Sequence, residues 1–263
     1  MNLEKQLQDN PELKEYLKKL AIKDDYDYPN VSVLIPTYNR RKFMRLIAIN
    51  LFNTLYPKNK LEVVILDDGD EPLFINEVEV KSFSQTIGIS IKYIYDNSKH
   101  LTIGEKRNKL VKLAKYKICI NMDDDDIYFP QYIPYSVKLL KDNKVGIVGS
   151  PDMLFVYPHY DFKMSYIICR AKRQIHEATF CYTKKHWKQM NGYIKNGIGE
   201  GAKMIDYNEK MCLKSEVINC MCCIAHKNNT VDKEKFKDEN TNAIDFELPN
   251  EYKDIIKEIL DLQ

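Results

Sequence analysis

The sequence predicts an α/β fold in which helices flank a mostly parallel, Rossmann-like β-sheet. Short apolar runs, such as VSVLIP at 31–36 and LEVVILDD at 61–68, are typical of strands that are buried on both faces. Segments with helical character at 41–55 and 101–115 alternate with these runs, and this rhythm favours parallel strand connections. Because ligands of such sheets bind beyond the carboxyl ends of the strands, functional residues are expected there.

The first half of the chain continues this pattern. Segments 89–96 and 116–122 are predicted to be the third and fourth strands. Between them, Thr102 has the side-chain oxygen that an N-cap residue needs at the start of a helix. Upstream of the first strand, leucines at helical spacing in 11–22 predict an amphipathic helix.

Beyond residue 145 the predicted elements become shorter and favour a second, smaller mixed sheet. The polar stretch at 228–245 is expected to be a mobile loop. Strands are predicted at 146–150, 153–160, 164–171, 178–183 and 217–226, helices at 184–190, 204–212 and 248–263, and a glycine-containing loop at 191–201.

Composition excludes some classes of partner. Forty basic and thirty-eight acidic residues leave a net charge of +2, so no nucleic-acid partner is expected. No apolar stretch is long enough for a membrane span, and the first ten residues lack the apolar core of a signal peptide, so a cytoplasmic protein is predicted. The abundant Lys, Asn, Ile and Tyr are typical of an AT-rich genome, such as that of a large DNA virus or a parasite.

Seven cysteines without a secretion signal indicate reduced thiols. A zinc site formed by the late cysteines with His226 is one interpretation. However, the paired CxxC spacing of zinc sites is absent, and CMCC lies in an apolar run, which favours packing in a buried strand. The late cysteines are Cys212, Cys220, Cys222 and Cys223.

Four successive carboxylates, Asp123 to Asp126, follow the predicted fourth strand directly. Adjacent like charges repel one another, and a divalent cation would remove that cost. Oxygen ligands of this kind suit Mg²⁺ or Mn²⁺, with substrate phosphates filling the remaining positions. A solvated acidic turn is the alternative, but the apolar residues that follow, from Ile127 to Phe129, argue against it.

Four segments in order, VSVLIPTYNR, VVILDDG, GEKRN and INMDDDD, resemble the family 2 glycosyltransferases. The resemblance covers about 31–130 and implies a GT-A fold, a nucleotide-sugar donor such as a UDP-sugar, and a DxD metal site for Mn²⁺ or Mg²⁺. It places the DxD on Asp123 and Asp125, with Asp124 and Asp126 as the other register. The implied parts are a helix and connector (1–30), a catalytic domain (31–226) with nucleotide-binding (31–130) and acceptor (131–226) halves, and a mobile loop with a C-terminal helix (227–263).

The family pattern and the residue chemistry together suggest a set of donor-binding residues. Tyr38 has an aromatic ring that can stack near the base, and Asp67 or Asp68 can accept the N–H of a uracil ring. Arg107 can face the base or the diphosphate, although a surface helix charge is the alternative. The complete predicted set is Pro36, Thr37, Tyr38, Arg40, Asp67, Asp68, Arg107, Asn108, Asp123 and Asp124.

On the acceptor side, Glu200 is the predicted general base and Asp206 the second choice. The family has an acidic base in a Glu-Asp motif at this point, whereas this chain has Glu200-Gly201. A histidine after a late strand completes the metal shell in many GT-A enzymes, which implies His226 as a ligand. Trp187 and Met190 are further candidates for acceptor contacts.

The acceptor is expected to be a glycan or a protein, and the family implies inversion at the transferred sugar. Three other functions remain open. A nucleotidyltransferase would need a glycine-rich loop where this chain has PTYNR. A phosphohydrolase with Asp123 as nucleophile would need a later cluster of Lys and Asp. The third is a catalytically inactive module that binds nucleotide sugars or glycans.

Overall fold

The computed structural model describes residues 26–169, 174–195, 199–205, 212–227, 229, 232–241 and 247–262. The predicted helix at 11–22, the candidate base Asp206 and most of the predicted helix at 204–212 lie outside these ranges. Within them, no helix combines the length and the apolar character that crossing a membrane requires.

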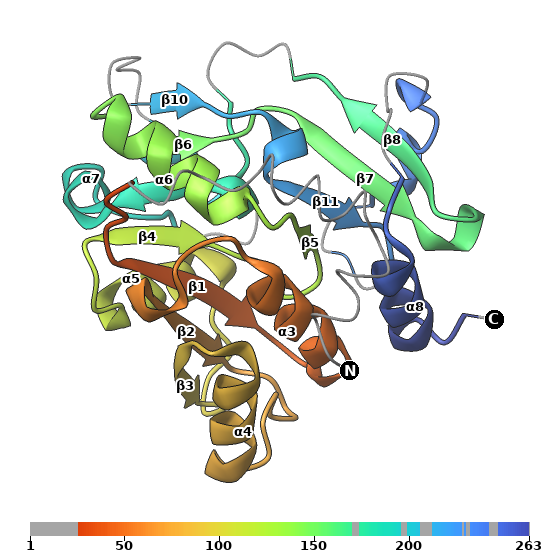
Figure 1. The fold of residues 1–263 in the computed structure, drawn as a ribbon, viewed down its shortest axis with the longest axis horizontal. Helices are drawn as coiled ribbons and strands as arrows, with labels where there is room; N and C mark the ends of the chain where they lie inside the picture. The colour runs from red at the N-terminus through yellow and green to blue at the C-terminus, as the bar shows by residue number, and fades with distance from the viewer. Residues whose placement is uncertain are drawn as a thin grey trace.

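A seven-stranded sheet forms the centre of the molecule (Figure 1). Strand β1 pairs in parallel with β2 and β4, while β9 runs antiparallel between β4 and β6. The mostly parallel sheet predicted from the sequence is therefore confirmed. In spatial order the strands are β10 (Cys212–Lys214), β6 (Ile147–Gly149), β9 (Cys181–Thr183), β4 (Ile118–Asn121), β1 (Val31–Thr37), β2 (Leu61–Asp67) and β3 (Ser90–Tyr95).

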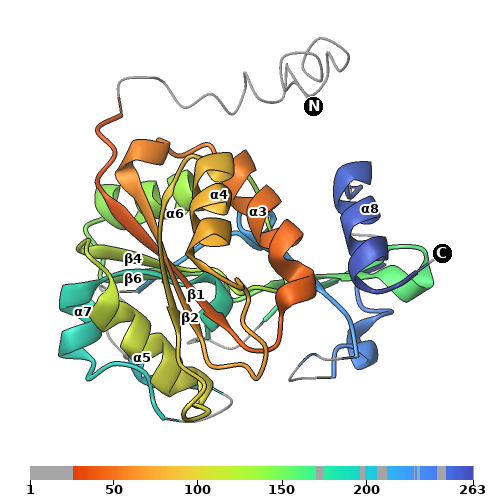
Figure 2. The same cartoon turned by 90° about the horizontal axis from the view of Figure 1, so that it is seen from below.

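Helices cover both faces of this sheet (Figure 2). On β1, Val33 and Ile35 belong to the core under α3, whereas Leu34 packs with Leu110 of α5 on the opposite face. Every residue of β1 is buried, as its uninterrupted apolar run predicts. One face carries α3 (Met44–Asn53), α4 (Glu77–Ile87) and α6 (Tyr132–Asp142), and the other carries α5 (Ile103–Leu113) and α7 (Lys184–Gln189).

A second, four-stranded sheet extends the molecule beyond β4, and α8 packs against α3 beside it. This sheet mixes parallel and antiparallel pairs, so the predicted smaller mixed sheet is also confirmed. Its strands are β5 (Ile127–Tyr128), β11 (Met221–Ile224), β7 (Met153–Tyr157) and β8 (Lys163–Ile167), and α8 spans Asn250–Ile259. Short 3₁₀ turns complete the fold: η1 (Arg41–Phe43), η2 (Lys58–Lys60), η3 (Pro158–Tyr160), η4 (Glu177–Thr179), η5 (Ala202–Met204), η6 (Val217–Asn219) and η7 (Glu234–Phe236).

Local capping explains where the helices around the site begin. The predicted N-cap Thr102 is confirmed, because its side chain accepts from Glu105 N and the Glu105 carboxylate accepts from Thr102 N in a capping box. Helices α4 and α6 were not predicted from the sequence. The start of α4 depends on Asn76, whose side chain accepts from Glu79 N, and its end on Gly88 at φ 69°.

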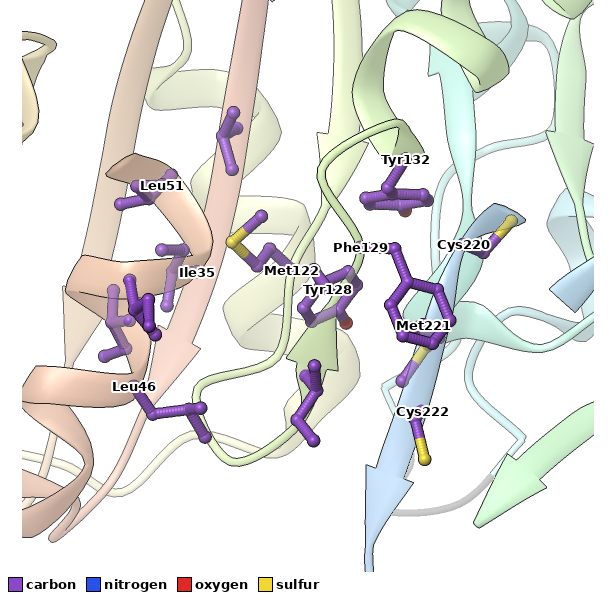
Figure 3. Packing of buried hydrophobic residues seen from close by; sticks show 14 of the residues in the cluster. Ile35, Leu46, Leu51, Met122, Tyr128, Phe129, Tyr132, Cys220, Met221 and Cys222 are labelled. Atoms are coloured by element: carbon purple, nitrogen blue, oxygen red, sulfur yellow. The ribbon is translucent and has the colours of Figure 1, made fainter. Parts of the chain in front are cut away.

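The residues after the acid run form part of the core that joins the two sheets (Figure 3). Tyr128 and Tyr132 are fully buried there, with ring centroids 5.0 Å apart. Cys220 and Cys222 lie beside them, and all seven cysteines are free thiols. The three cysteines at 220, 222 and 223 therefore pack as small apolar side chains of the second sheet.

Asn50 of α3 holds the loop that carries the acid run. Its side-chain amide is buried, donates to Asp126 O at 2.9 Å and accepts from Tyr128 N at 3.1 Å. One buried side chain thus satisfies two buried backbone groups. The position of the carboxylates is therefore fixed from α3 as well as from β4.

We expect Asn50→Ala to lower the free energy of unfolding by roughly 2–4 kcal/mol, because it leaves two buried backbone groups unpaired. Urea denaturation followed by circular dichroism measures this change. Asn143→Ala is the control, since Asn143 is exposed at the end of α6. Equal stability of the two variants would show that Asn50 does not hold the loop.

Candidate functional site

The site lies at the carboxyl edge of the large sheet, where β1, β2 and β4 end. Thr37 at the end of β1 is in register with Asp67 at the end of β2. Asn121 is the last residue of β4 and pairs with Leu34, so the acid run begins two residues later at the same edge. Parallel strands thus bring three predicted segments together, as the sequence suggests.

The two aspartates that end β2 are both buried and hydrogen-bonded. Asp67 accepts from Gly69 N at 2.9 Å, from Leu73 N at 2.7 Å and from the Tyr93 hydroxyl at 2.8 Å. These bonds shape the turn after β2. Asp67 therefore organises this loop, whatever else it binds.

Asp68 accepts from Leu101 N at 2.7 Å and pairs with the buried ammonium of Lys106. Lys106 also donates to Thr37 O at 2.8 Å and lies 5.7 Å from the centre of the Tyr38 ring. The ring of Tyr38 is 43% exposed, which leaves it open to a planar ligand. Lys106 joins the ends of β1 and β2, and the sequence analysis did not single it out.

Arg107 of α5 is a buried positive charge of the site. It is 3% exposed, its Nε donates to Glu200 Oε1 at 2.9 Å, and its Nη2 donates to Asp123 Oδ1 at 2.9 Å. Burial disfavours its charge, but the two carboxylates outweigh this effect and raise the pKa of Arg107 well above its usual range. Its Nη1 is buried without a hydrogen-bond partner among the described residues, which leaves one donor for a bound anion.

Gly104 allows α5 to approach the loop that carries Glu200. A Cβ atom at this position would lie 1.8 Å from Ile194 O and 3.1 Å from Glu200 Cβ. Only glycine permits this contact. The helix can therefore bring Arg107 against Glu200, which lies 93 residues later in the chain.

Asn108 and Trp187 bond to each other. Asn108 Oδ1 accepts from Trp187 Nε1 at 2.9 Å and from Tyr193 N at 2.9 Å, and its Nδ2 donates to Tyr193 O at 2.8 Å. Met190 is partly buried in the same apolar cluster. These contacts fasten the start of the loop at 191–201 to α5. The roles predicted for the three residues in ligand binding remain predictions.

Asp125, in the acid run, pairs with His226, which follows β11. Asp125 Oδ2 lies 3.1 Å from His226 Nε2 and 3.0 Å from Arg40 Nη2. Burial opposes ionisation of Asp125, but the hydrogen bond with His226 and the charges of Lys233 and Arg40 outweigh it and lower its pKa to about 2. Asp125 is therefore ionised at neutral pH.

The other carboxylates of the run have different surroundings. Burial raises the pKa of Asp123, which Arg107 partly offsets, and burial with the charge of Asp125 raises the pKa of Asp124 well above its usual range. Burial also raises the pKa of Asp126 to about 7. Asp126 Oδ1 accepts from Ile224 N of β11 at 3.0 Å, a contact that connects the acid run to the second sheet.

The predicted metal ligands fit a divalent cation in part. A carboxylate and an imidazole at 3.1 Å are suitable ligands for Mn²⁺, and Asp125 carries the charge that a cation requires. Asp123 instead faces Arg107. In the described part of the chain, no three His, Cys, Asp or Glu side chains form a metal-binding group. A cation here would take its further ligands from bound phosphates and water.

The loop at 199–201 and the turn η4 meet near Arg107 and the end of β4. Glu200 is 5% exposed and bonded to Arg107, as described above. Glu177 of η4 accepts from Gly201 N at 3.0 Å through Oε1 and is only partly buried. Its backbone carbonyl accepts from Asn121 Nδ2 at 2.7 Å, which attaches η4 to the end of β4. Glu177 was not predicted from the sequence, because only the strand β9 that follows it brings it here.

Comparison with protein families shows that this α/β fold is that of a glycosyltransferase. The chain belongs to glycosyl transferase family 2, whose family description matches residues 32–199. It is 28% identical to a hyaluronan synthase of Pasteurella multocida over 142 residues, which are 52% of this chain and 14% of that protein. It is 30% identical to a chondroitin synthase of Escherichia coli over 141 residues, 52% of this chain and 19% of that protein. The chain thus spans less than a fifth of these relatives.

Solved structures support the GT-A fold. The mannosyltransferase PcManGT from Pyrobaculum calidifontis, in complex with GDP-Man and Mn²⁺, matches with a TM-score of 0.58 and 18% identity over 94% of this chain and 76% of that one. TarS 1–349 of S. aureus, in complex with UDP-GlcNAc, matches with a TM-score of 0.51 and 14% identity over 88% of this chain and 65% of that one. At these identities the likeness concerns the fold, and it confirms the fold that the sequence predicts.

We expect Arg107→Met to lower the free energy of unfolding by roughly 3–5 kcal/mol, because it leaves the buried carboxylate of Glu200 and the partly buried one of Asp123 without their counter-charge. Lys109→Met on the same helix is the control, since Lys109 pairs with Asp96 at the surface and such pairs contribute about 0–1 kcal/mol. Urea denaturation of both variants decides the matter. Similar losses would contradict a buried charge cluster around Arg107.

Proposed function

We propose that this glycosyltransferase moves a sugar from a nucleoside diphosphate, most favourably a UDP-sugar, to a hydroxyl group of a glycan or protein acceptor. The transfer depends on Mn²⁺ or Mg²⁺ and inverts the configuration of the sugar. The observation that carries this proposal is the pair of Asp125 and His226 at the carboxyl edge of the sheet, with Asp125 ionised at neutral pH. The Mn²⁺ in the complex of PcManGT is consistent with it.

The donor would occupy the edge formed by β1, β2 and α5. The exposed ring of Tyr38 can stack on the base, and Asp68 lies at the next strand end, held by Lys106. The unpartnered Nη1 of Arg107 is buried and suits a phosphate oxygen of the donor. Thr37, at the end of β1, and Arg40, which follows it, belong to the same edge and support this proposal.

A bound cation at Asp125 and His226 would neutralise the charge that develops on the departing diphosphate. Arg107 contributes a second, fixed positive charge to the same region, because it is held in place by Asp123 and Glu200. A carboxylate must also take the proton of the acceptor hydroxyl as the new bond forms. The sequence assigns this role to Glu200, and that assignment stays a prediction.

The first test is a donor screen with the whole chain. Thermal unfolding is followed with UDP, GDP, UDP-GlcNAc and GDP-mannose, each with and without Mn²⁺, because a ligand that binds only the folded state raises its stability. Release of UDP or GDP from the two sugar donors is then measured with water as acceptor. A catalytically inactive binding module would be stabilised but would release no nucleotide.

We expect Asp125→Asn to weaken the Mn²⁺-dependent binding of UDP at least tenfold, because it removes the charged ligand of the cation. Titration calorimetry with UDP and Mn²⁺ measures the effect. Asp161→Asn is the control, since Asp161 is exposed and lies between β7 and β8. Equal UDP affinity with and without Mn²⁺ in the wild-type protein would contradict the metal site.

A further inference from the structure

The corner where η4 meets the loop at 199–201 contains two glutamates, Glu177 and Glu200, and a glycine at position 201. The backbone of Gly201 has φ −81° and ψ −5°, a conformation that any residue adopts. Glycine is required here for space instead. A Cβ atom on residue 201 would lie 2.5 Å from Glu177 Cγ, 2.8 Å from Phe180 Cε2 and 2.9 Å from Glu177 Oε1. The side chain of Glu177 thus fills the volume that a side chain at 201 would occupy.

Glu177 and Glu200 differ in what holds them. Glu200 is 5% exposed, and its Oε1 is bonded to the guanidinium of Arg107. A carboxylate that compensates a buried arginine loses that compensation when it takes a proton. Glu177 has no ion-pair partner among the described residues, and its Oε2 accepts no hydrogen bond from them. Glu177 is also partly exposed, so an entering hydroxyl group can reach its side chain.

The position of Glu177 at the reacting edge is fixed by the backbone. Asn121 N donates to Phe180 O at 2.9 Å, and Asn121 Nδ2 donates to Glu177 O at 2.7 Å. The Tyr128 hydroxyl donates to Ala178 O at 3.1 Å and accepts from Asp123 N at 2.8 Å. The turn η4 is therefore bonded on both sides to the segment that carries the acid run.

We propose that Glu177 is the general base of the transfer reaction and that it supplies, from η4, the carboxylate that is missing at Gly201. This inference rests on the proposed function. As the acceptor oxygen forms its bond to the anomeric carbon, Glu177 Oε2 takes the hydroxyl proton. The bond between that carbon and the diphosphate oxygen breaks, and its electron pair leaves with the nucleoside diphosphate. The proton then passes from Glu177 to solvent.

In this assignment Glu200 is a positioning residue. It holds Arg107 at Nε and leaves Nη1 without a partner among the described residues, so that Nη1 can bind the diphosphate of the donor. The two glutamates then have separable effects. Replacing Glu177 should lower turnover without affecting the binding of the donor, whereas replacing Glu200 should also weaken the binding of UDP.

The test compares Glu177→Gln, Glu200→Gln and the wild-type protein. We measure UDP or GDP release from UDP-GlcNAc and GDP-mannose with water as acceptor, and UDP affinity by calorimetry with Mn²⁺. Glu177→Gln is expected to lower kcat by roughly 10²- to 10⁴-fold, the usual contribution of a positioned base, and to leave UDP affinity within about threefold. Glu216→Gln, at an exposed position away from the corner, is the control and should match the wild type.

A second variant separates a base from a structural residue. Glu177→Ala opens a space in which a small carboxylate can take the proton, so added sodium formate is expected to raise its kcat at least tenfold. The same concentration of formate should leave Glu200→Gln unchanged. Thermal unfolding of each variant checks that it is folded.

Three results would overturn the assignment: near-normal kcat in Glu177→Gln, a loss of UDP affinity as large as the loss of kcat, or no effect of formate on folded Glu177→Ala. Loss of kcat confined to Glu200→Gln would return the role to Glu200. If the wild-type protein releases no nucleotide from either donor, the proposed transferase function fails, and this inference fails with it. Failure of the base alone leaves wild-type turnover intact, so the two failures are distinguishable.

Discussion

Four adjacent carboxylates at the end of a buried strand impose the main constraint on this structure. Their mutual repulsion in a poorly solvated place must be offset, or the strand end cannot hold its position. The fold meets this demand by giving the carboxylates basic or polar neighbours, of which Arg40 is shared by Asp124 and Asp125. These neighbours come from distant parts of the chain: Arg107 of α5 for Asp123, Arg40 after β1 for Asp124, His226 after β11 for Asp125, and Lys233 with the backbone of β11 for Asp126.

Because their surroundings differ, adjacent aspartates of the acid run differ in pKa. The pKa of Asp125 is lowered to about 2, whereas burial raises that of Asp126 to about 7. The first is a permanent anion that suits a cation, and the second ties β11 to the loop through Ile224 N. Groups whose environments drive their pKa values apart usually have different roles. In the proposed function, Asp125 binds the cation, while Asp126 connects the loop to β11.

The sequence predicted the parallel sheet and the strand ends well, because buried parallel strands are continuous apolar runs and their ends are marked by polar residues. The Thr102 cap was equally readable, since its partner lies three residues away. Helix α4 was missed because EVEVKSF alternates as a strand would, and tertiary packing overrides that pattern. The roles of Lys106 and Asn108 could not be distinguished from sequence, because one faces Asp68 and the other faces Trp187 only in the folded chain.

The contact between Glu177 and Gly201 shows the limit of assigning roles to residues, one position at a time, from a family pattern. Such a transfer asks which residue occupies a position, and at position 201 it finds glycine and no carboxylate. The structure shows which atoms occupy the volume, and there Glu177 takes up the space beside the Gly201 backbone. A glycine at an ordinary φ needs a steric reason, and the side chain that provides this reason is itself an acid. In our proposal, Glu177 therefore accounts both for the carboxylate that is absent at position 201 and for the glycine found there, although it lies 24 residues away in the chain.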